Sequence, residues 1–189
     1  MGRKEQKEER RQQILFKALE LFVTKGYQET KISDIAGELG ISVGLLFHYY
    51  ESKEALHYEL VKMGVEGTKY PNGTGFEKAI DYFAGFLKVL LETVKTNPWV
   101  SQIFILTSQA RRPGMPEEAR KLAMTIDQIG FSAKIVEKGQ KDGSIREGDP
   151  VALSAAFWCS VQGIVEQHAY DGTLPLPEAD WVTDILRRR

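Results

Sequence analysis

The chain has 189 residues and is nearly neutral, with 25 Lys plus Arg against 26 Asp plus Glu and a formal net charge of -1. Its longest uninterrupted apolar run, residues 155–159, is far shorter than the roughly 18 to 20 residues that cross a bilayer, so a membrane span is excluded. The polar residues 1–13 indicate no secretory signal and favour a cytoplasmic protein, and the single Cys159 excludes an intramolecular disulfide and a cysteine-ligated metal site.

Helical periodicity runs along almost the whole chain, because apolar residues recur at steps of three and four and no run alternates as a half-buried strand does. We therefore expect an all-α protein of about nine helices. The first helix carries one apolar stripe and ends near Gly26, a residue that tolerates the left-handed backbone of a helix end. The stripe consists of Ile14, Leu15, Ala18, Leu19 and Phe22.

Two short helices joined by a tight turn are predicted next. One covers residues 32–39, with Thr30 placed to cap its start and Gly40 placed to end it. After about three residues, Ser42 can cap another helix that runs to about Tyr50. This is the arrangement of a helix-turn-helix DNA-binding unit, although a helix hairpin that serves only packing has the same pattern.

The remaining chain is predicted to contain a connecting helix and a larger helical region. Ser52 can cap the connecting helix, which ends where Gly and Pro accumulate between residues 64 and 75. Further helices are expected over residues 76–94, 98–110, 119–136 and 150–170, the last capped by Asp149, followed by a short helix around Trp181. We divide the chain into a DNA-binding domain (residues 1–51), a connecting helix and linker (52–75) and a ligand-binding and dimerisation domain (76–189).

The second short helix of the predicted helix-turn-helix has an unusually apolar outer surface. If Leu46 and Tyr50 face the core, the side chains pointing outward are Val43, Gly44, Leu45, Phe47, His48 and Tyr49. Exposed apolar side chains are costly unless something covers them. Thymine methyl groups and sugar edges of a DNA major groove can do so, and a glycine lets the backbone come close to the duplex.

At these residues the sequence resembles the tetracycline-repressor (TetR) family of bacterial transcriptional regulators. The resemblance extends over residues 10–60 and rests on residues 14–22, 25–27, 30–36, 40–50 and 52–54. It implies a dimeric all-helical regulator with three DNA-binding helices, a connecting fourth helix, and a five-helix domain for ligand binding and dimerisation.

The resemblance also implies roles for individual residues. It assigns phosphate contacts to Thr30, Tyr49 and Lys53, and base-edge contacts to Val43, Gly44 and Leu45. For Lys53 there is a physical argument as well, because the start of a helix favours an anion; the alternative is a solvated surface lysine. The complete predicted DNA-binding set is Thr30, Ser42, Val43, Gly44, Leu45, Phe47, His48, Tyr49 and Lys53.

The sequence departs from the family pattern on the predicted recognition helix. The family commonly has Lys or Arg in place of Val43, a small polar residue in place of Leu45 and Tyr in place of Phe47, so three hydrogen-bonding groups are missing. We expect specificity from thymine methyl contacts and duplex shape, with phosphates supplying most of the affinity. The same three residues motivate an alternative function, a small-molecule-binding helical module whose DNA binding is weakened or lost.

The amino-terminal leader has an excess of basic residues. Residues 1–17 hold six Lys or Arg against three Glu. Such a leader either reaches phosphates or a minor groove, or is a solvated and frayed terminus, and the second interpretation is slightly favoured because chain ends are commonly unordered.

The expected carboxyl-terminal domain is rich in aromatic residues, most of which we expect in its core, although a ligand cavity has the same composition. The ligand-binding candidates are Phe83, Phe86, Trp99, Phe104, Phe131, Trp158 and Gln162. The helix at residues 150–170 is apolar on more than one face, which favours packing against a second subunit. The predicted partners are an inverted-repeat operator in double-stranded DNA, a small apolar or aromatic effector, and a second copy of the chain.

No catalytic site, cofactor or metal site is predicted. Residues 40–44 match the G-x-S-x-G pattern of a hydrolase, but that motif requires a strand before the serine, and residues 34–39 have helical spacing. His48, His57 and His168 lie on three different predicted helices, without partners at metal-ligand spacing.

Overall fold

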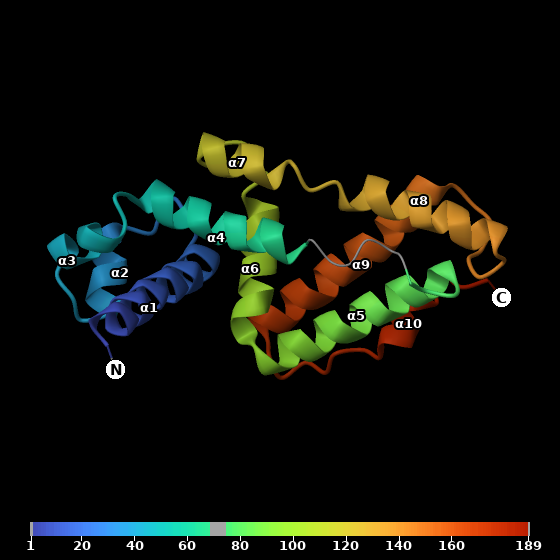
Figure 1. The fold of residues 1–189 in the computed structure, drawn as a ribbon, viewed down its shortest axis with the longest axis horizontal. Helices are drawn as coiled ribbons and strands as arrows, with labels where there is room; N and C mark the ends of the chain where they lie inside the picture. The colour runs from blue at the N-terminus through green and yellow to red at the C-terminus, as the bar shows by residue number, and fades with distance from the viewer. Residues whose placement is uncertain (1, 69–74, 189) are drawn as a thin grey trace. The chain divides into compact units, whose positions relative to one another are not determined.

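The computed structural model describes residues 2–68 and 75–188, and every regular element in this part of the chain is an α-helix (Figure 1). The all-α prediction is confirmed. Part of the predicted linker, residues 69–74, lies outside the described residues. The ten helices of the described residues are α1 (Arg3–Thr24), α2 (Ile32–Glu38), α3 (Val43–Tyr49), α4 (Lys53–Gly67), α5 (Ala79–Thr96), α6 (Pro98–Gln109), α7 (Glu117–Ala123), α8 (Gln128–Lys141), α9 (Pro150–Tyr170) and α10 (Ala179–Thr183).

The helix expected over residues 119–136 is divided into α7 and α8. Thr125 follows α7 and donates its hydroxyl to the Leu122 carbonyl oxygen at 2.7 Å. Asp127 then caps α8, since its carboxylate accepts the Gly130 N–H at 2.9 Å and its backbone is not helical. The apolar spacing continues across this break, so periodicity alone does not reveal it.

Other predicted helix starts are confirmed by their hydrogen bonds. The Ser52 hydroxyl accepts the Ala55 N–H at 3.0 Å at the start of α4. The Asp149 carboxylate accepts the Ala152 N–H at 2.7 Å at the start of α9. Both side chains satisfy backbone donors that have no partner within the helix.

The chain forms two compact units. The first comprises Met1–Gly67 with Gln102–Thr125, and the second comprises Thr68–Ser101 with Ile126–Arg189. The boundary therefore passes through α6. The functional division into DNA-binding, connecting and ligand-binding parts stays a prediction.

The core of the first unit is built around the apolar stripe of α1. All five stripe residues are buried, as their spacing predicts. Helices α2, α3 and α4 contribute Ile35, Leu46 and Leu60 to the same cluster, and α7 packs on α4. Burial of several elements against one stripe holds short helices that would not be stable alone.

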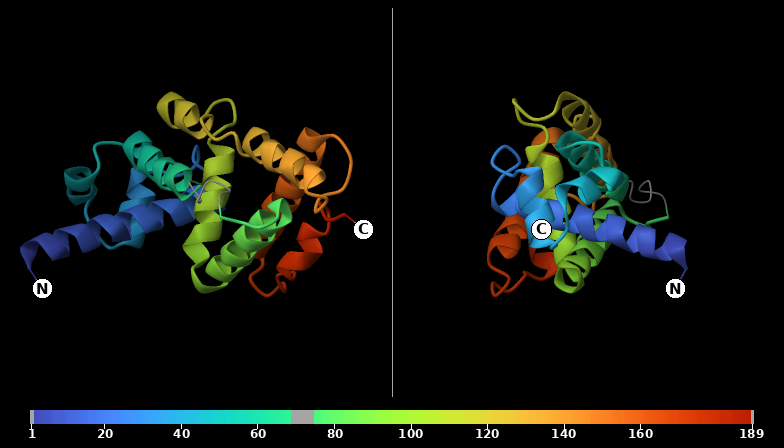
Figure 2. Two further views of the ribbon diagram at one scale, coloured as in Figure 1. Left: turned by 45° about the vertical axis from the view of Figure 1, so that its right-hand side comes forward. Right: turned by 90° about the vertical axis from the view of Figure 1, so that its left-hand side faces the viewer.

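The second unit contains α5, α8, α9 and α10. Helices α8 and α9 pack along each other, and α10 lies against α5 and α9 (Figure 2). A buried polar contact links α8 to α9: the Trp158 indole N–H donates to Ser132 Oγ at 2.7 Å, and the hydroxyls of Ser132 and Ser154 are 2.8 Å apart. These buried polar groups therefore form hydrogen bonds with one another in an otherwise apolar interior.

Helices α4 and α6 approach closely at Gly64. A Cβ placed on Gly64 would lie 1.9 Å from Thr107 Oγ1 and 3.0 Å from Thr107 Cβ. Thr107 is buried and donates its hydroxyl to the Ile103 carbonyl oxygen at 2.7 Å. A side chain at position 64 would therefore displace a packed residue.

We expect Gly64→Ala to lower the free energy of unfolding by about 1–3 kcal/mol, because overpacking in a closed site costs that much. The better helix propensity of alanine offsets at most about 1 kcal/mol, so the overlap decides the sign. Thr107→Ala should recover part of the loss in the double variant, as measured by denaturant titration. Wild-type stability of the single Gly64 variant would contradict the close approach.

Candidate nucleic-acid interface

Helix α2, the turn after it and helix α3 form the candidate DNA-binding unit (Figure 1). After α2 ends at Glu38, Gly40 takes a φ of +62°, a conformation that glycine adopts without steric cost. Ser42 then caps α3 as predicted, because its Oγ accepts the Leu45 N–H at 3.1 Å. The two helices are consequently joined by a short turn of defined geometry.

Helix α3 is oriented by its buried side. Leu46 is 0% exposed and Tyr50 is 4% exposed, as their spacing predicts. Val43, Leu45 and Phe47, which we call the apolar ridge, are 40%, 41% and 47% exposed. Val43 and Phe47 are one turn apart on the same side of this seven-residue helix and Leu45 lies on the other side, so apolar side chains are exposed around much of α3. Such exposure favours a partner that covers them.

The other predicted DNA-binding residues of α3 are Gly44, His48 and Tyr49. His48 is exposed and Tyr49 is half-buried, with 5.5 Å between their ring centroids. Gly44 is also exposed, and a Cβ placed there would meet nothing closer than Ser42 Oγ at 4.0 Å. The structure therefore brings these predicted residues together on one short helix, with open space at the glycine.

Thr30 lies apart from them, at the end of the loop between α1 and α2. Its side chain is buried, and its hydroxyl shares its hydrogen between the carbonyl oxygens of Gly26 at 2.7 Å and Leu21 at 3.2 Å. The prediction that Thr30 caps α2 is wrong, because Lys31 is the N-cap and its N–H bonds to the Asp34 carboxylate at 3.1 Å. The hydroxyl instead adds a second donor to two carbonyls at and after the end of α1, each of which also accepts a backbone N–H. A phosphate contact by Thr30 stays a prediction.

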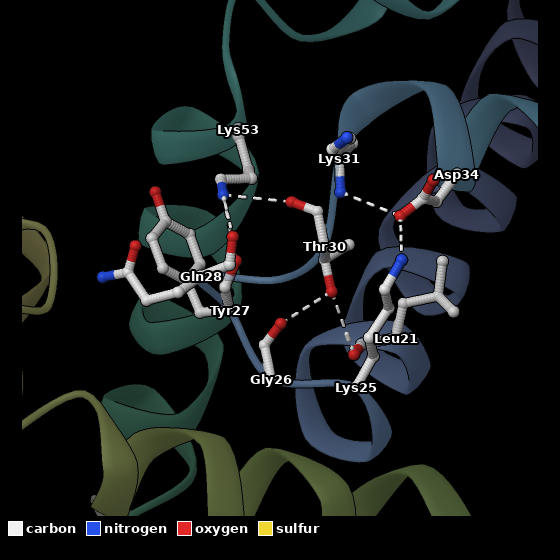
Figure 3. Close-up of polar contacts among 9 residues, drawn as sticks. All are labelled: Leu21, Lys25, Gly26, Tyr27, Gln28, Thr30, Lys31, Asp34 and Lys53. Carbon is white, nitrogen blue, oxygen red and sulfur yellow. Dashed lines mark hydrogen bonds and ion pairs between the residues drawn. The ribbon is translucent and has the colours of Figure 1, made fainter.

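The ammonium group of Lys53 is directed into the same loop (Figure 3). Its Nζ donates to the carbonyl oxygens of Tyr27 at 2.9 Å, Thr30 at 3.0 Å and Gln28 at 3.5 Å, and it lies 4.3 Å from the centroid of the Tyr27 ring. An ammonium has three donors, so these carbonyls occupy all of them. We call this arrangement the Lys53 clasp; it ties the start of α4 to the loop before α2, and a phosphate contact by Lys53 stays a prediction.

A second link between elements lies beside the clasp. Lys25 at the end of α1 forms an ion pair with Asp34 in α2 (Figure 3). The hydrogen bond from Lys25, followed by the one from the Lys31 backbone, holds the pKa of the Asp34 carboxyl below its ordinary value. The sequence carries no spacing signal for either link, because the partners lie on different elements.

Tyr27 connects the clasp to a buried imidazole. Its hydroxyl donates to Glu54 Oε1 at 3.0 Å, and burial, followed by this bond, raises the pKa of Tyr27. The Tyr27 ring lies 4.6 Å from the ring of His57, which is 0% exposed and has no hydrogen-bond partner for either nitrogen among the described residues. Burial, reinforced by the charge of Lys53 and opposed by Glu54, lowers the pKa of His57 to about 4.

His57 should make the free energy of unfolding depend on pH between about 6.5 and about 4. Because its pKa is lower in the folded than in the unfolded chain, the unfolded chain binds the proton first and stability falls as the pH decreases through this interval. The loss reaches at most about 3 kcal/mol. In denaturant titrations His57→Leu should abolish this dependence, whereas His48→Leu, at an exposed position, should keep it. An unaltered pH profile in the His57 variant would disprove this assignment.

Replacing Lys53 by Met retains an aliphatic stem but removes the donors of the clasp. We expect the free energy of unfolding to fall by about 1–3 kcal/mol, since carbonyl groups lose charged partners. Lys62→Met, at an exposed position of the same helix, should stay within about 0.5 kcal/mol of wild type in chemical denaturation. Equal stabilities of the two variants would argue against a structural role for Lys53.

In the second unit the predicted ligand-binding residues are only partly gathered. Phe83, Phe157, Trp158 and Phe86 form a run in which successive ring centroids are 5.0, 5.4 and 5.0 Å apart. Phe131 of α8 is linked to this run through Tyr82, whose ring centroid is 6.3 Å from that of Phe131 and 5.3 Å from that of Phe83. Of the other candidates, Trp99 and Gln162 lie on α6 and α9, and Phe104 belongs to the first unit. Ligand binding by any of these residues stays a prediction.

The described residues contain no cluster of three or more His, Cys, Asp or Glu that could hold a metal ion. None of the helices described is long and apolar enough to cross a membrane. The hydrolase pattern at residues 40–44 lacks its structural context, because helix α2 precedes Ser42 and the serine hydroxyl caps α3.

Residues 14–60, which extend from the buried stripe of α1 into α4, match the family model described as bacterial regulatory proteins, tetR family. The match covers 47 of the 189 residues and shows that this segment is similar to TetR-family regulators. The clasp, the α2–α3 turn and the apolar ridge all lie within the matched segment.

Known TetR regulators resemble the chain over most of its length. The transcriptional regulator RutR of Escherichia coli (strain K12) is 26% identical over 152 residues, which are 79% of this chain and 70% of RutR. The transcriptional repressor KstR2 of Mycolicibacterium smegmatis is 25% identical over 162 residues, which are 81% of this chain and 78% of KstR2.

Solved structures show the same fold. The MbdR regulator from Azoarcus sp. CIB superposes with a TM-score of 0.79 at 19% identity, over 92% of this chain and 95% of MbdR. AibR, in a complex with isovaleryl coenzyme A and operator DNA, gives a TM-score of 0.69 at 18% identity, over 93% of this chain and 94% of AibR.

Proposed function

We propose that this protein is a transcriptional repressor that binds an inverted-repeat operator as a homodimer and leaves it when a small apolar or aromatic molecule binds. The observation that carries this function is the apolar ridge on α3. It is exposed on a helix that the Ser42 cap and buried Leu46 hold in place, within the segment that matches the TetR family model. A packing hairpin has no need for such a surface.

The chemistry of the ridge favours a particular mode of DNA recognition. Val43, Leu45 and Phe47 have no hydrogen-bonding side-chain groups, so they suit thymine methyl groups and the apolar faces of sugars. Gly44 allows close approach of the helix backbone, and His48 and Tyr49 supply polar groups beside the ridge. Most of the affinity then comes from phosphates and most of the specificity from methyl contacts and duplex shape.

The outer face of α9 supports the homodimer. Ala152, Ala156, Cys159 and Gly163 recur at steps of four, three and four and are exposed, and a Cβ placed on Gly163 would meet nothing within 4 Å. Small residues along one helix face let a second helix approach closely. A twofold dimer then presents two α3 helices to half-sites about 34 Å apart.

An effector is favoured by the aromatic run of the second unit and by what relatives bind. The AibR structure contains isovaleryl coenzyme A, and a putative regulator from Saccharomonospora viridis, with a TM-score of 0.64 at 20% identity over 96% of this chain and all of that one, contains choline. Release requires that the effector bind the DNA-incompatible state more tightly. Helix α4, which carries Lys53 and Gly64, is the candidate lever for this change. A regulator of this kind needs no catalytic residue or cofactor, and it acts in the cytoplasm, where bacterial chromosomal DNA lies.

Selection of bound duplexes from random sequence, followed by titration of the enriched operator at several salt concentrations, tests this function. We expect an inverted repeat whose half-sites are about one helical turn apart, with affinity that falls steeply as salt increases. A module that only holds small molecules would enrich no sequence and would bind scrambled and selected duplexes equally.

Phe47→Ala should weaken binding to the selected operator by about 10- to 100-fold, because truncation removes most of the apolar contact of one buried aromatic side chain. Binding to scrambled duplexes should change little. Val89→Ala, which truncates an exposed apolar residue on α5, is the matched control and should keep wild-type affinity in the same titration. Equal operator affinities of the two variants would show that the ridge is not part of the DNA interface.

A further inference from the structure

The amino-terminal part of α1 extends beyond the core of the first unit. Helix α1 begins at Arg3, whereas its first buried residue is Ile14. The Glu5 carboxylate accepts the Gly2 N–H at 2.7 Å at the helix start. The frayed terminus slightly favoured from the sequence is therefore an ordered helix, and both views of Figure 2 show it projecting past the other helices of this unit. We call residues 3–13 the arm.

Helix formation sorts the charges of the arm onto two sides. Arg3, Lys7 and Arg10 are separated by four and three residues, so they share one side, which we call the basic face. Lys4 and Arg11 flank this face. The acidic residues fall on the opposite side, at positions 5, 8 and 9. A modest excess of positive charge in the sequence thus becomes a stripe of one sign.

The basic face borders the buried side of α1. Ile14 follows Lys7 by two helical turns, so the stripe of cations is in line with one edge of the stripe that packs in the core. Arg11 shows the direction: it forms an ion pair with Glu59 of α4, and its guanidinium lies 4.9 Å from the centroid of the Tyr50 ring. Tyr50 is the C-cap of α3, so Arg11, which flanks the basic face, lies beside the end of α3.

Most of these cations have no partner within the protein. Arg3, Lys4, Lys7 and Arg10 form no ion pair with any residue that the structure describes, whereas Arg11 is paired with Glu59. Arg3, Lys4 and Lys7 are exposed, and Arg10 is half-buried. Like charges three and four residues apart oppose helix formation, so the stability of α1 does not account for their alignment.

We propose that the basic face of the arm binds the phosphate backbone of the duplex that flanks the half-site contacted by α3. This inference rests on the proposed DNA-binding function and adds a second contact surface to it. The arm is about 16 Å long, enough to follow several phosphates spaced about 3.4 Å apart along the axis of one strand. Its cations contribute affinity and salt dependence but no base preference, because phosphates carry no sequence information.

Two charge-matched double variants test the inference on the selected operator. Lys7→Gln with Arg10→Gln removes two cations from the basic face, and Lys88→Gln with Lys95→Gln removes two exposed cations from α5 in the second unit. Glutamine preserves helix propensity, and circular dichroism with thermal melting verifies that both variants fold. Dissociation constants are measured between about 50 and 300 mM salt, on a duplex with long flanks and on one trimmed to the half-sites.

On the long duplex, the plot of log association constant against log salt concentration should become less steep for the arm variant, by about 1.8 for each chain. For the α5 variant its slope should stay at the wild-type value. The ratio of affinities for operator and scrambled duplexes should not change. On the trimmed duplex the two variants should bind alike. An unchanged slope for the arm variant, or an equal decrease for both variants, would overturn the inference while leaving the proposed function intact; absence of DNA binding by the wild type would overturn both.

Discussion

The insertion of Leu46 into the core formed by the α1 stripe is the contact on which the candidate interface depends. A helix of seven residues is too short to be stable alone, so its position is set by what it buries. Leu46 and Tyr50 are fixed inward, whereas their neighbours Val43 and Phe47, at the border of the buried side, are 40% and 47% exposed. The cost of exposing these side chains is therefore a consequence of how α3 is anchored, and DNA is the partner that offsets it in the proposed function.

The Lys53 clasp gives this small unit a second means of holding its elements together. Three carbonyls of one loop converge on a single ammonium group, and Tyr27 covers it while packing against His57. The family resemblance suggests a phosphate contact at Lys53, yet the structure shows that the residue also organises the protein itself. Because Lys53 is the first residue of α4, the clasp joins the loop before α2 to the helix that we propose as the lever for effector release.

Charge placement, more than net charge, determines what this nearly neutral chain can bind. A formal charge of -1 gives no indication of a nucleic-acid partner. Once residues 3–13 are helical, however, their acidic and basic residues occupy opposite sides, and Arg11, beside the unpaired cations, contacts Tyr50 at the end of α3. The apolar ridge and the basic face then have complementary tasks, the first in selecting bases and the second in holding the backbone.

The sequence by itself determined most of the helices, their buried stripes, the Ser42 cap and the helix end at Gly40, because each of these signals acts within about four residues. The break between α7 and α8 was not among them. The sequence also determined the family resemblance, which resides in the same local segments. Only the tertiary structure decided the acceptors of Lys53 and the close approach at Gly64. These contacts join elements that are distant along the chain, and the spacing of residues specifies which side of a helix is buried but not which neighbouring element it meets.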